Sequence, residues 1–210
     1  MVGVAALLLS ASLAGAASAS AFTNGSFETP GAPDPFSTLA TGNTTINGWT
    51  VGLAGIDYIG NYWQASDGNS SLDMSALDAG SIRQTFDTIL GQRYNVLFDL
   101  AGNFNPGYQD IKNLRVDAGG ATYSDYAFDI TGTGPSNMGW RTESYGFTAA
   151  GSSTTLTFTS LTHTAGGAAL DNVRVSAAVP EPASWALMVI GFGGLGAALR
   201  SRRRLSTATA

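Results

Sequence analysis

Residues 92–102 read QRYNVLFDLAG and carry the clearest secondary-structure signal in the chain. Tyr94, Val96, Phe98 and Leu100 occupy every second position of this segment. A period of two places alternate side chains on opposite faces of a strand, so we expect these four to share one buried face. The segment therefore predicts a half-buried β-strand.

The same alternation appears elsewhere between residues 22 and 178, where no convincing amphipathic helix occurs. Leu156 and Phe158 alternate with threonines in TTLTFTS (154–160), and Val173 alternates with Val175. Residues 29–45, with three prolines, are expected to form a loop. Turn signals between the apolar runs include Asn47-Gly48, Asp67-Gly68, Gly119-Gly120 and Gly166-Gly167. The pattern predicts an all-β domain over 22–178, a single jelly-roll β-sandwich.

Composition restricts the function classes. The sequence has 210 residues, and the roughly 160 left without the two ends suit one domain. It contains no cysteine, which excludes disulfides, thiolate metal sites and a cysteine nucleophile. Before Pro180 there are 14 acidic and 6 basic side chains, a net charge of −8. This balance argues against nucleic acid as a partner, since Lys and Arg contacts to phosphate supply most of that affinity.

Both ends of the chain read as targeting segments. Residues 1–21 are apolar and rich in small residues, with Leu7-Leu8-Leu9 as a short hydrophobic region, and predict a signal peptide. An uncleaved anchor is the alternative. Near the other end, residues 183–199 carry no charge, and as a helix they would extend about 26 Å, nearly the thickness of a bilayer core. They predict a transmembrane helix, with a buried amphipathic helix as the alternative.

Arginines follow that apolar run and fix its expected orientation. They are Arg200, Arg202, Arg203 and Arg204. Such a cluster stays on the cytoplasmic side, which makes residues 205–210 a cytoplasmic tail and places the sandwich outside.

The order of parts in the tail resembles the PEP-CTERM sorting signal of Gram-negative bacteria. The matching parts are Pro180-Glu181-Pro182, ASWA (183–186), the Gly-rich apolar run and the arginine cluster, over residues 179–204. The resemblance implies export, which we assign to the Sec machinery, and transient anchoring in the inner membrane. It also implies recognition by exosortase, with a cut near Pro180-Glu181-Pro182, and a final location at the cell surface or outside the cell.

The middle region is similar to the choice-of-anchor C family, which is related to plant cell-wall proteins of galactose-binding-like fold. The similar blocks, in order, are NGSFE (24–28), GWTV (48–51), DYI (57–59), YWQASDG (62–68), LDM (72–74), GSIRQTF (80–86) and ALDNV (169–173). This resemblance implies a galactose-binding-like β-sandwich attached to varied sorting tails, with carbohydrate binding as the expected role, and it does not imply an enzyme.

Aromatic and polar residues between 49 and 73 suggest a carbohydrate site. Sugars stack on aromatic faces and bond to amides and carboxylates through their hydroxyls. Tyr58 and Tyr62 are expected to form an exposed platform, whereas Trp49 and Trp63 fit either a site or the core. The predicted ligand-binding residues are Tyr58, Tyr62, Trp63, Gln64, Asp67 and Trp140.

A structural calcium ion is the one cofactor that we expect, because an exported chain without disulfides gains stability from a cation. The resemblance to galactose-binding-like modules points to Glu28 and Asp171 as its ligands. Asp67, Asn69, Ser71 and Asp73 form a second acidic set, which a plain hairpin explains better because the EF-hand glycine and glutamate are missing.

Catalysis has little support in the sequence. His163 is the only histidine and lies in a turn-rich segment, and no Gly-x-Ser-x-Gly motif occurs. We therefore predict a non-catalytic surface or extracellular-matrix protein that binds polysaccharide. A structural biofilm or matrix protein without specific sugar binding, and an envelope glycoside hydrolase, are the alternatives.

Overall fold

The computed structural model describes residues 21–120, 122–178 and 189–192. The predicted signal peptide, apart from Ala21, lies outside these ranges, as do the sorting signal and cytoplasmic tail, apart from the short helical segment 189–192. Within the described ranges no helix is long and apolar enough to cross a bilayer.

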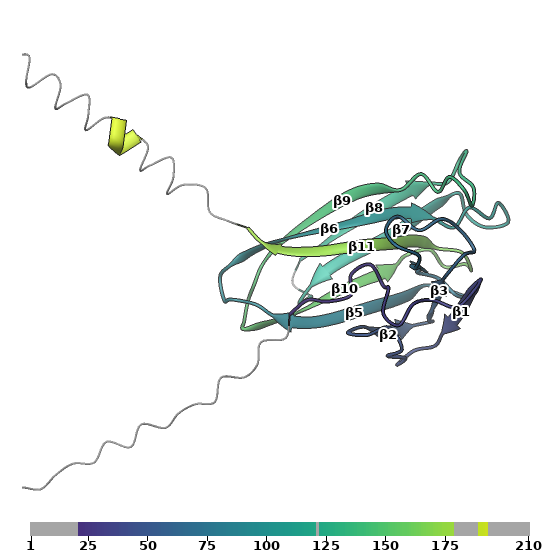
Figure 1. Cartoon of the computed structure of the whole chain (residues 1–210), viewed down its shortest axis with the longest axis horizontal. Coiled ribbons are helices and arrows are strands. Elements are labelled where there is room, and N and C mark those ends of the chain that lie inside the picture. The colour runs from purple at the N-terminus through teal and green to yellow at the C-terminus, as the bar shows by residue number, and fades with distance from the viewer. Residues whose placement is uncertain (1–20, 121, 179–188, 193–210) are drawn as a thin grey trace, which may run out of the picture.

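The domain is a sandwich of two antiparallel sheets (Figure 1). The six-stranded sheet has the order β1 (Phe36–Leu39), β3 (Ile56–Ile59), β4 (Ser71–Asp73), β11 (Ala168–Ala177), β6 (Arg93–Gly102) and β9 (Arg141–Thr148). The five-stranded sheet has the order β2 (Thr50–Leu53), β5 (Gly80–Asp87), β10 (Ser153–Ser160), β7 (Ile111–Ala118) and β8 (Tyr123–Asp129). From β4 to β7 and again from β8 to β11, consecutive strands alternate between the sheets. The predicted all-β jelly-roll sandwich is confirmed.

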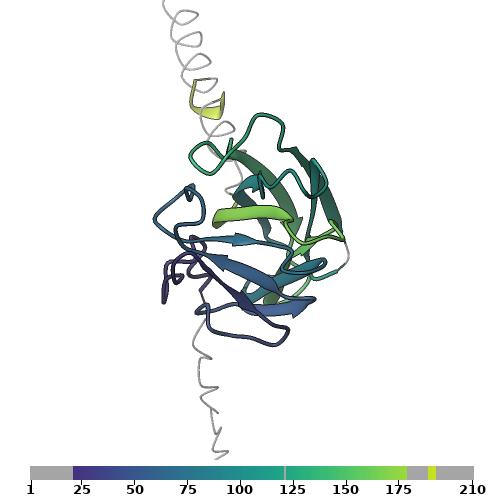
Figure 2. The same cartoon turned by 90° about the vertical axis from the view of Figure 1, so that its right-hand side faces the viewer.

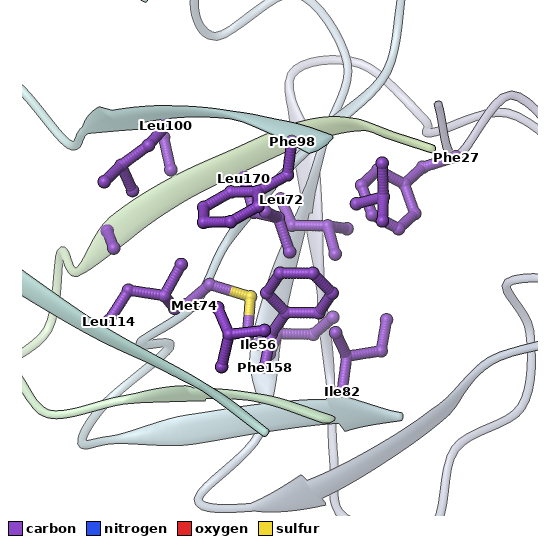
Figure 3. Close-up of a cluster of buried hydrophobic side chains, with 14 of the residues drawn as sticks. Phe27, Ile56, Leu72, Met74, Ile82, Phe98, Leu100, Leu114, Phe158 and Leu170 are labelled. Carbon is purple, nitrogen blue, oxygen red and sulfur yellow. The ribbon is translucent and has the colours of Figure 1, made fainter. Parts of the chain in front are cut away.

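The core lies between the sheets, and period-two alternation builds it. In β6 the side chains of Tyr94, Val96, Phe98 and Leu100 are all buried, as predicted. The Phe98 ring contacts Phe158 of β10 in the opposite sheet, with ring centroids 5.3 Å apart. Figure 3 shows these rings among aliphatic side chains that both sheets contribute. Aromatic rings at this edge-to-face distance add to the free energy of burial.

Strand β1 falls inside the segment that was expected to be a loop, so that expectation is wrong. The three prolines of that segment, Pro30, Pro33 and Pro35, all precede β1. β1 is also the edge strand of its sheet and pairs only with β3. An edge strand needs backbone N–H donors on one side only, so nearby prolines are tolerated. Phe36 at its first position faces out and is 41% exposed.

The connections divide between two ends of the sandwich. At one end, called here the loop end, lie the connections β2–β3, β4–β5, β6–β7, β8–β9 and β10–β11, as the strand registers require. The other end, called the tail end, holds β5–β6, β7–β8 and β9–β10 together with the last residue of β11. Figure 1 shows residue 21 and the end of β11 both at the tail end, and Figure 2 looks onto the loop end. The first described residues and the end of β11 therefore lie on the side opposite the long loops.

Candidate functional site

A hollow of about 280 Å³ lies at the loop end, where the outer face of the six-stranded sheet meets four connections. Strands β1, β3 and β4 supply its floor, and the β3–β4, β4–β5, β6–β7 and β10–β11 connections supply its walls. The lining residues are Phe36, Thr38, Asp57, Ile59, Tyr62, Asp73, Ala76, Leu77, Asn103, Asn105, Tyr108, Ala165 and Gly166.

Aromatic rings form one side of this hollow. The ring centroid of Tyr62 lies 5.5 Å from that of Phe36 and 5.6 Å from that of Phe104. The Tyr62 and Phe104 rings are stacked, with an angle of 27° between their planes. Tyr108, in the β6–β7 connection, is 36% exposed and lies under the Lys112 ammonium at 5.8 Å. Ring faces at an open hollow are what the apolar side of a pyranose needs for stacking.

Two carboxylates lie side by side on the floor, because Asp57 of β3 and Asp73 of β4 are register partners. Asp57 accepts a hydrogen bond from Thr38 Oγ1 at 2.6 Å, and burial raises its pKa. Asp73 is fully buried and accepts hydrogen bonds from Asn103 Nδ2 and Gly167 N, both at 2.7 Å. Burial raises the pKa of Asp73 to about 6, and the negative charge of Asp57 adds to the shift. Asp57 is the more accessible of the two carboxylates and could accept a hydrogen bond from a ligand hydroxyl. Asp73 instead connects two loops through its hydrogen bonds with Asn103 and Gly167.

Lys112, the only lysine in the sequence, supports the hollow from the opposite sheet. Its side chain is buried, and Nζ donates a hydrogen bond to the Gly166 carbonyl at 2.8 Å. Burial lowers the Lys112 pKa, while the charges of Asp73 and Asp110 oppose that shift. Residues 166 and 167 are therefore fixed between a cation on β7 and an anion on β4.

Of the predicted ligand-binding residues, only Tyr62 lines this hollow. Tyr58 is 1% exposed, and its hydroxyl donates a hydrogen bond to the Phe27 carbonyl and accepts one from Gly31 N. The expectation of an exposed Tyr58 is therefore wrong, since Asp57 takes the outward position of β3 and period two turns Tyr58 into the core. Trp63 is also buried, with Nε1 donating to Ser71 Oγ at 2.8 Å, so it offers no free ring face.

Gln64 and Trp140 come together, although they lie outside the hollow. Trp140 Nε1 donates to the Gln64 carbonyl at 2.9 Å. Gln64 lines a separate surface depression of about 660 Å³ with Asp34, Asn61 and Asn69. Trp63 is the aromatic residue that lines this depression, and it is only 3% exposed. The aromatic hollow, with its exposed rings, is therefore the better carbohydrate candidate.

The two predicted calcium ligands hold the same loop from opposite sides. Asp171 Oδ2 accepts hydrogen bonds from the backbone N–H groups of Ser66 and Asp67 at 2.8 and 2.9 Å. Glu28 Oε1 accepts those of Asn69 and Ser70 at 2.8 and 2.7 Å.

Asp67 itself is exposed and accepts a hydrogen bond from Ser26 Oγ at 2.7 Å. Among the described residues, no group of three or more His, Cys, Asp or Glu side chains could hold a metal ion. Calcium binding at Glu28 and Asp171 stays a prediction. A turn at Gly68 leads into β4, as the hairpin explanation of residues 67–73 expects, but no strand directly precedes that turn, because β3 ends at Ile59.

Most residues of the hollow were not predicted from the sequence. Phe36 was assigned to a loop, and Asn103, Asn105 and Tyr108 were not singled out. The segment NFNPGY (103–108) did carry a signal, because aromatic and amide residues alternate there directly after a buried strand.

The fold and the hollow define a class: a jelly-roll β-sandwich with an aromatic, acidic depression at one end. More specifically, the chain belongs to the family described as protein of unknown function (DUF642), whose model matches residues 20–176. Halomucin of Haloquadratum walsbyi is 32% identical over 159 residues, which is 72% of this chain. Because the match covers 2% of halomucin, the chain spans a small fraction of that relative's length.

Solved carbohydrate-binding modules have similar coordinates at low identity. The module TmCBM61, solved in complex with beta-1,4-galactotriose, is 15% identical with a TM-score of 0.46, over 77% of this chain and 100% of that one. A family 35 module from Clostridium thermocellum is 14% identical with a TM-score of 0.45, over 68% and 99% of the two chains.

The C-terminal tail matches the PEP-CTERM protein-sorting motif over residues 178–204. The predicted sorting signal is thereby confirmed, and it marks the chain as an exported protein. The matching family for the middle region is DUF642, so membership of the choice-of-anchor C family stays a prediction.

Proposed function

We propose that this protein is exported, sorted by exosortase and exposed at the cell surface or in the extracellular matrix, where its sandwich binds carbohydrate without catalysis. The hollow at the loop end is the proposed binding site. Phe36, Tyr62 and Tyr108 would stack on sugar rings, while Asp57 and Asn105 would accept and donate hydrogen bonds to hydroxyls.

One observation carries the carbohydrate proposal: aromatic faces and hydroxyl-bonding groups from distant segments converge on one open hollow. Phe36 and Tyr108 are 72 positions apart in the sequence, yet both line it. The lining contains two carboxylates and two amides but no Arg, Lys or His side chain. This chemistry favours neutral or amino sugars over uronic acids, whose carboxylates would meet Asp57.

The sorting motif supports the proposed route. The chain would leave through the Sec machinery, stay in the inner membrane through residues 183–199, and be cut by exosortase near Pro180-Glu181-Pro182. Intact-mass measurement of surface-released protein tests the cut. Released protein that retains Arg200 to Arg204 would contradict it.

Binding is tested with the full chain on a broad glycan array, in a detergent without a sugar headgroup. We expect saturable binding to at least one neutral or amino-sugar polysaccharide. Phe36→Ala and Tyr108→Ala should each weaken it about threefold to tenfold, the range expected for loss of one aromatic contact. Tyr123→Ala is the matched control, because Tyr123 is an exposed tyrosine on β8, outside the hollow.

The same experiment separates the alternatives. A folded chain without saturable binding to any glycan would favour a structural matrix protein. Release of reducing ends from a bound glycan would identify a glycoside hydrolase.

A further inference from the structure

An exposed apolar pair occupies the β5–β6 turn at the tail end of the sandwich. Ile89 and Leu90 are adjacent in the sequence, and their side chains are 69% and 71% exposed. We call residues 88–92 the tip. Single exposed apolar residues are common on protein surfaces, but two neighbours projecting from one turn form a protruding apolar patch.

The tip is held rigidly, so the pair is presented outward. Ile89 N donates a hydrogen bond to the Tyr94 hydroxyl at 3.0 Å, and Gln92 N donates to the Ile89 carbonyl at 2.9 Å. The neighbouring β9–β10 turn braces it, since Gly91 N donates to the Ala149 carbonyl at 2.8 Å. These hydrogen bonds stabilise the turn conformation in which Ile89 and Leu90 are exposed.

The tip lies beside the point where the sorting tail begins. Ala178 N donates to the Arg93 carbonyl at 2.8 Å, and Gln92 Nε2 donates to the Ala178 carbonyl at 2.8 Å. Residues 179–182 alone separate Ala178 from the uncharged run 183–199. Four residues reach at most about 14 Å when fully extended. If that run spans the membrane, the tip must lie close to the bilayer surface.

We propose that Ile89 and Leu90 insert into the lipid interface of the membrane while the tail anchors the chain. This inference rests on the anchoring step of the proposed function. Asp87 and Arg93 flank the tip with opposite charges, so the tip carries no net charge that an anionic bilayer would repel. Apolar side chains at this depth gain free energy by leaving water at the boundary of headgroups and acyl chains.

Insertion would orient the domain. Two contacts, the tail and the tip, restrict tilting more than a flexible tether does. Because the hollow lies at the loop end, opposite the tip, it would face away from the membrane. Removal of the tail would leave only two apolar side chains in contact with lipid, too few to retain the domain, which favours release after processing.

Site-directed labelling tests this directly, because the sequence has no cysteine of its own. Leu90→Cys in the full chain is labelled with a polarity-sensitive fluorophore and reconstituted into vesicles of phosphatidylethanolamine and phosphatidylglycerol. Lipids with a nitroxide near the top of the acyl chain serve as quenchers. We expect a blue-shifted emission and quenching about twofold or stronger, as for side chains at the acyl boundary. Leu53→Cys is the matched control, an exposed leucine at the loop end, and should remain unquenched.

Each outcome decides a separate point. An unquenched Leu90 label on a chain that floats with the vesicles overturns insertion and leaves the anchor intact. A chain that does not float overturns both. Quenching that needs added exosortase overturns lipid as the partner and assigns the tip to the protease. Glycan binding measured on the same labelled protein is independent, so failure there affects only the carbohydrate proposal.

Discussion

At the residue scale, two carboxylates, the buried Asp171 and the half-buried Glu28, hold the loop over the outer face of the six-stranded sheet. Asp171 and Glu28 each accept two backbone N–H bonds from residues 66–70. These bonds replace water around the carboxylate oxygens, which a buried carboxylate needs. Burial nevertheless raises the pKa of Asp171 to about 7.

Asp171 should make the fold less stable as pH rises. Its folded pKa of about 7 exceeds the unfolded value of about 3.9, so its stabilising contribution is complete below pH ~4 and is lost as pH rises through about 7. Asn does not titrate, so we expect Asp171→Asn to abolish this pH-dependent decrease in the free energy of unfolding, which amounts to up to about 4 kcal/mol at about 1.36 kcal/mol per pKa unit. Chemical denaturation of both proteins between pH 4 and 8 measures the effect. Equal pH slopes would contradict it.

Gly68 should resist substitution, because its φ is +66° and an added Cβ would lie 2.5 Å from Glu28 Oε1. We expect Gly68→Ala to lower the free energy of unfolding by about 1–3 kcal/mol, from backbone strain and displacement of Glu28. Gly42→Ala is the control, with a φ of +83° and no atom within 4 Å of the added Cβ. Denaturant midpoints that fall equally for both variants would show that the contact with Glu28 contributes nothing.

At the element scale, the two faces of β3 explain how the site is built. Tyr58 faces the core and Asp57 faces the hollow, one position apart. The hollow therefore depends on β1, β3 and β4 for its floor and on the connections around it for its walls. The β10–β11 connection is the wall with the clearest support, from Lys112 of β7 and Asp73 of β4.

Lys112→Met should loosen that wall. The variant keeps the apolar stem but leaves the Gly166 carbonyl without the Lys112 hydrogen bond, a loss of about 1–3 kcal/mol for a buried acceptor. We expect weaker glycan binding and faster amide hydrogen exchange at Gly166 and Gly167, with β10 still protected. Unchanged exchange at these two amides would show that Lys112 does not position the wall.

At the scale of the whole molecule, the sandwich has a targeting end and a proposed binding end. Both described chain ends lie at the tail end (Figure 1). The aromatic hollow lies at the loop end. The domain carries its proposed binding surface where anchoring would leave it accessible. The predicted calcium ion would act on the whole domain by linking β11 to the segment before β1.

Calcium should raise the melting temperature if Glu28 and Asp171 bind it. A ligand at 100 times its Kd stabilises the native state by about 2.7 kcal/mol, several degrees for a domain of this size. We expect a Tm rise with calcium, reversal by chelator, and no rise in a Glu28→Gln, Asp171→Asn double variant. If the Tm of the unmodified protein changes with neither calcium nor chelator, the predicted calcium site at Glu28 and Asp171 is wrong.

The sequence by itself determined the all-β sandwich and the sorting motif that marks the chain as exported. Alternation in residues 92–102 and 154–160 is local, because burial on one face of a strand repeats every second residue whatever its neighbours are. The sorting tail is likewise a linear pattern that is read as sequence. Both were therefore predictable without a structure.

Only the tertiary structure decided which aromatic residues reach a surface and where they meet. Tyr62 lines the hollow, and its role in binding stays a prediction, whereas Tyr58 and Trp63 are core residues. Phe36, Asp57 and Tyr108 reach the hollow from separate segments of the chain. Their convergence depends on the register between β1, β3 and β4 and on loops that cross between sheets. Such non-local contacts leave no period in the sequence, so the binding hollow could be seen only in the folded chain.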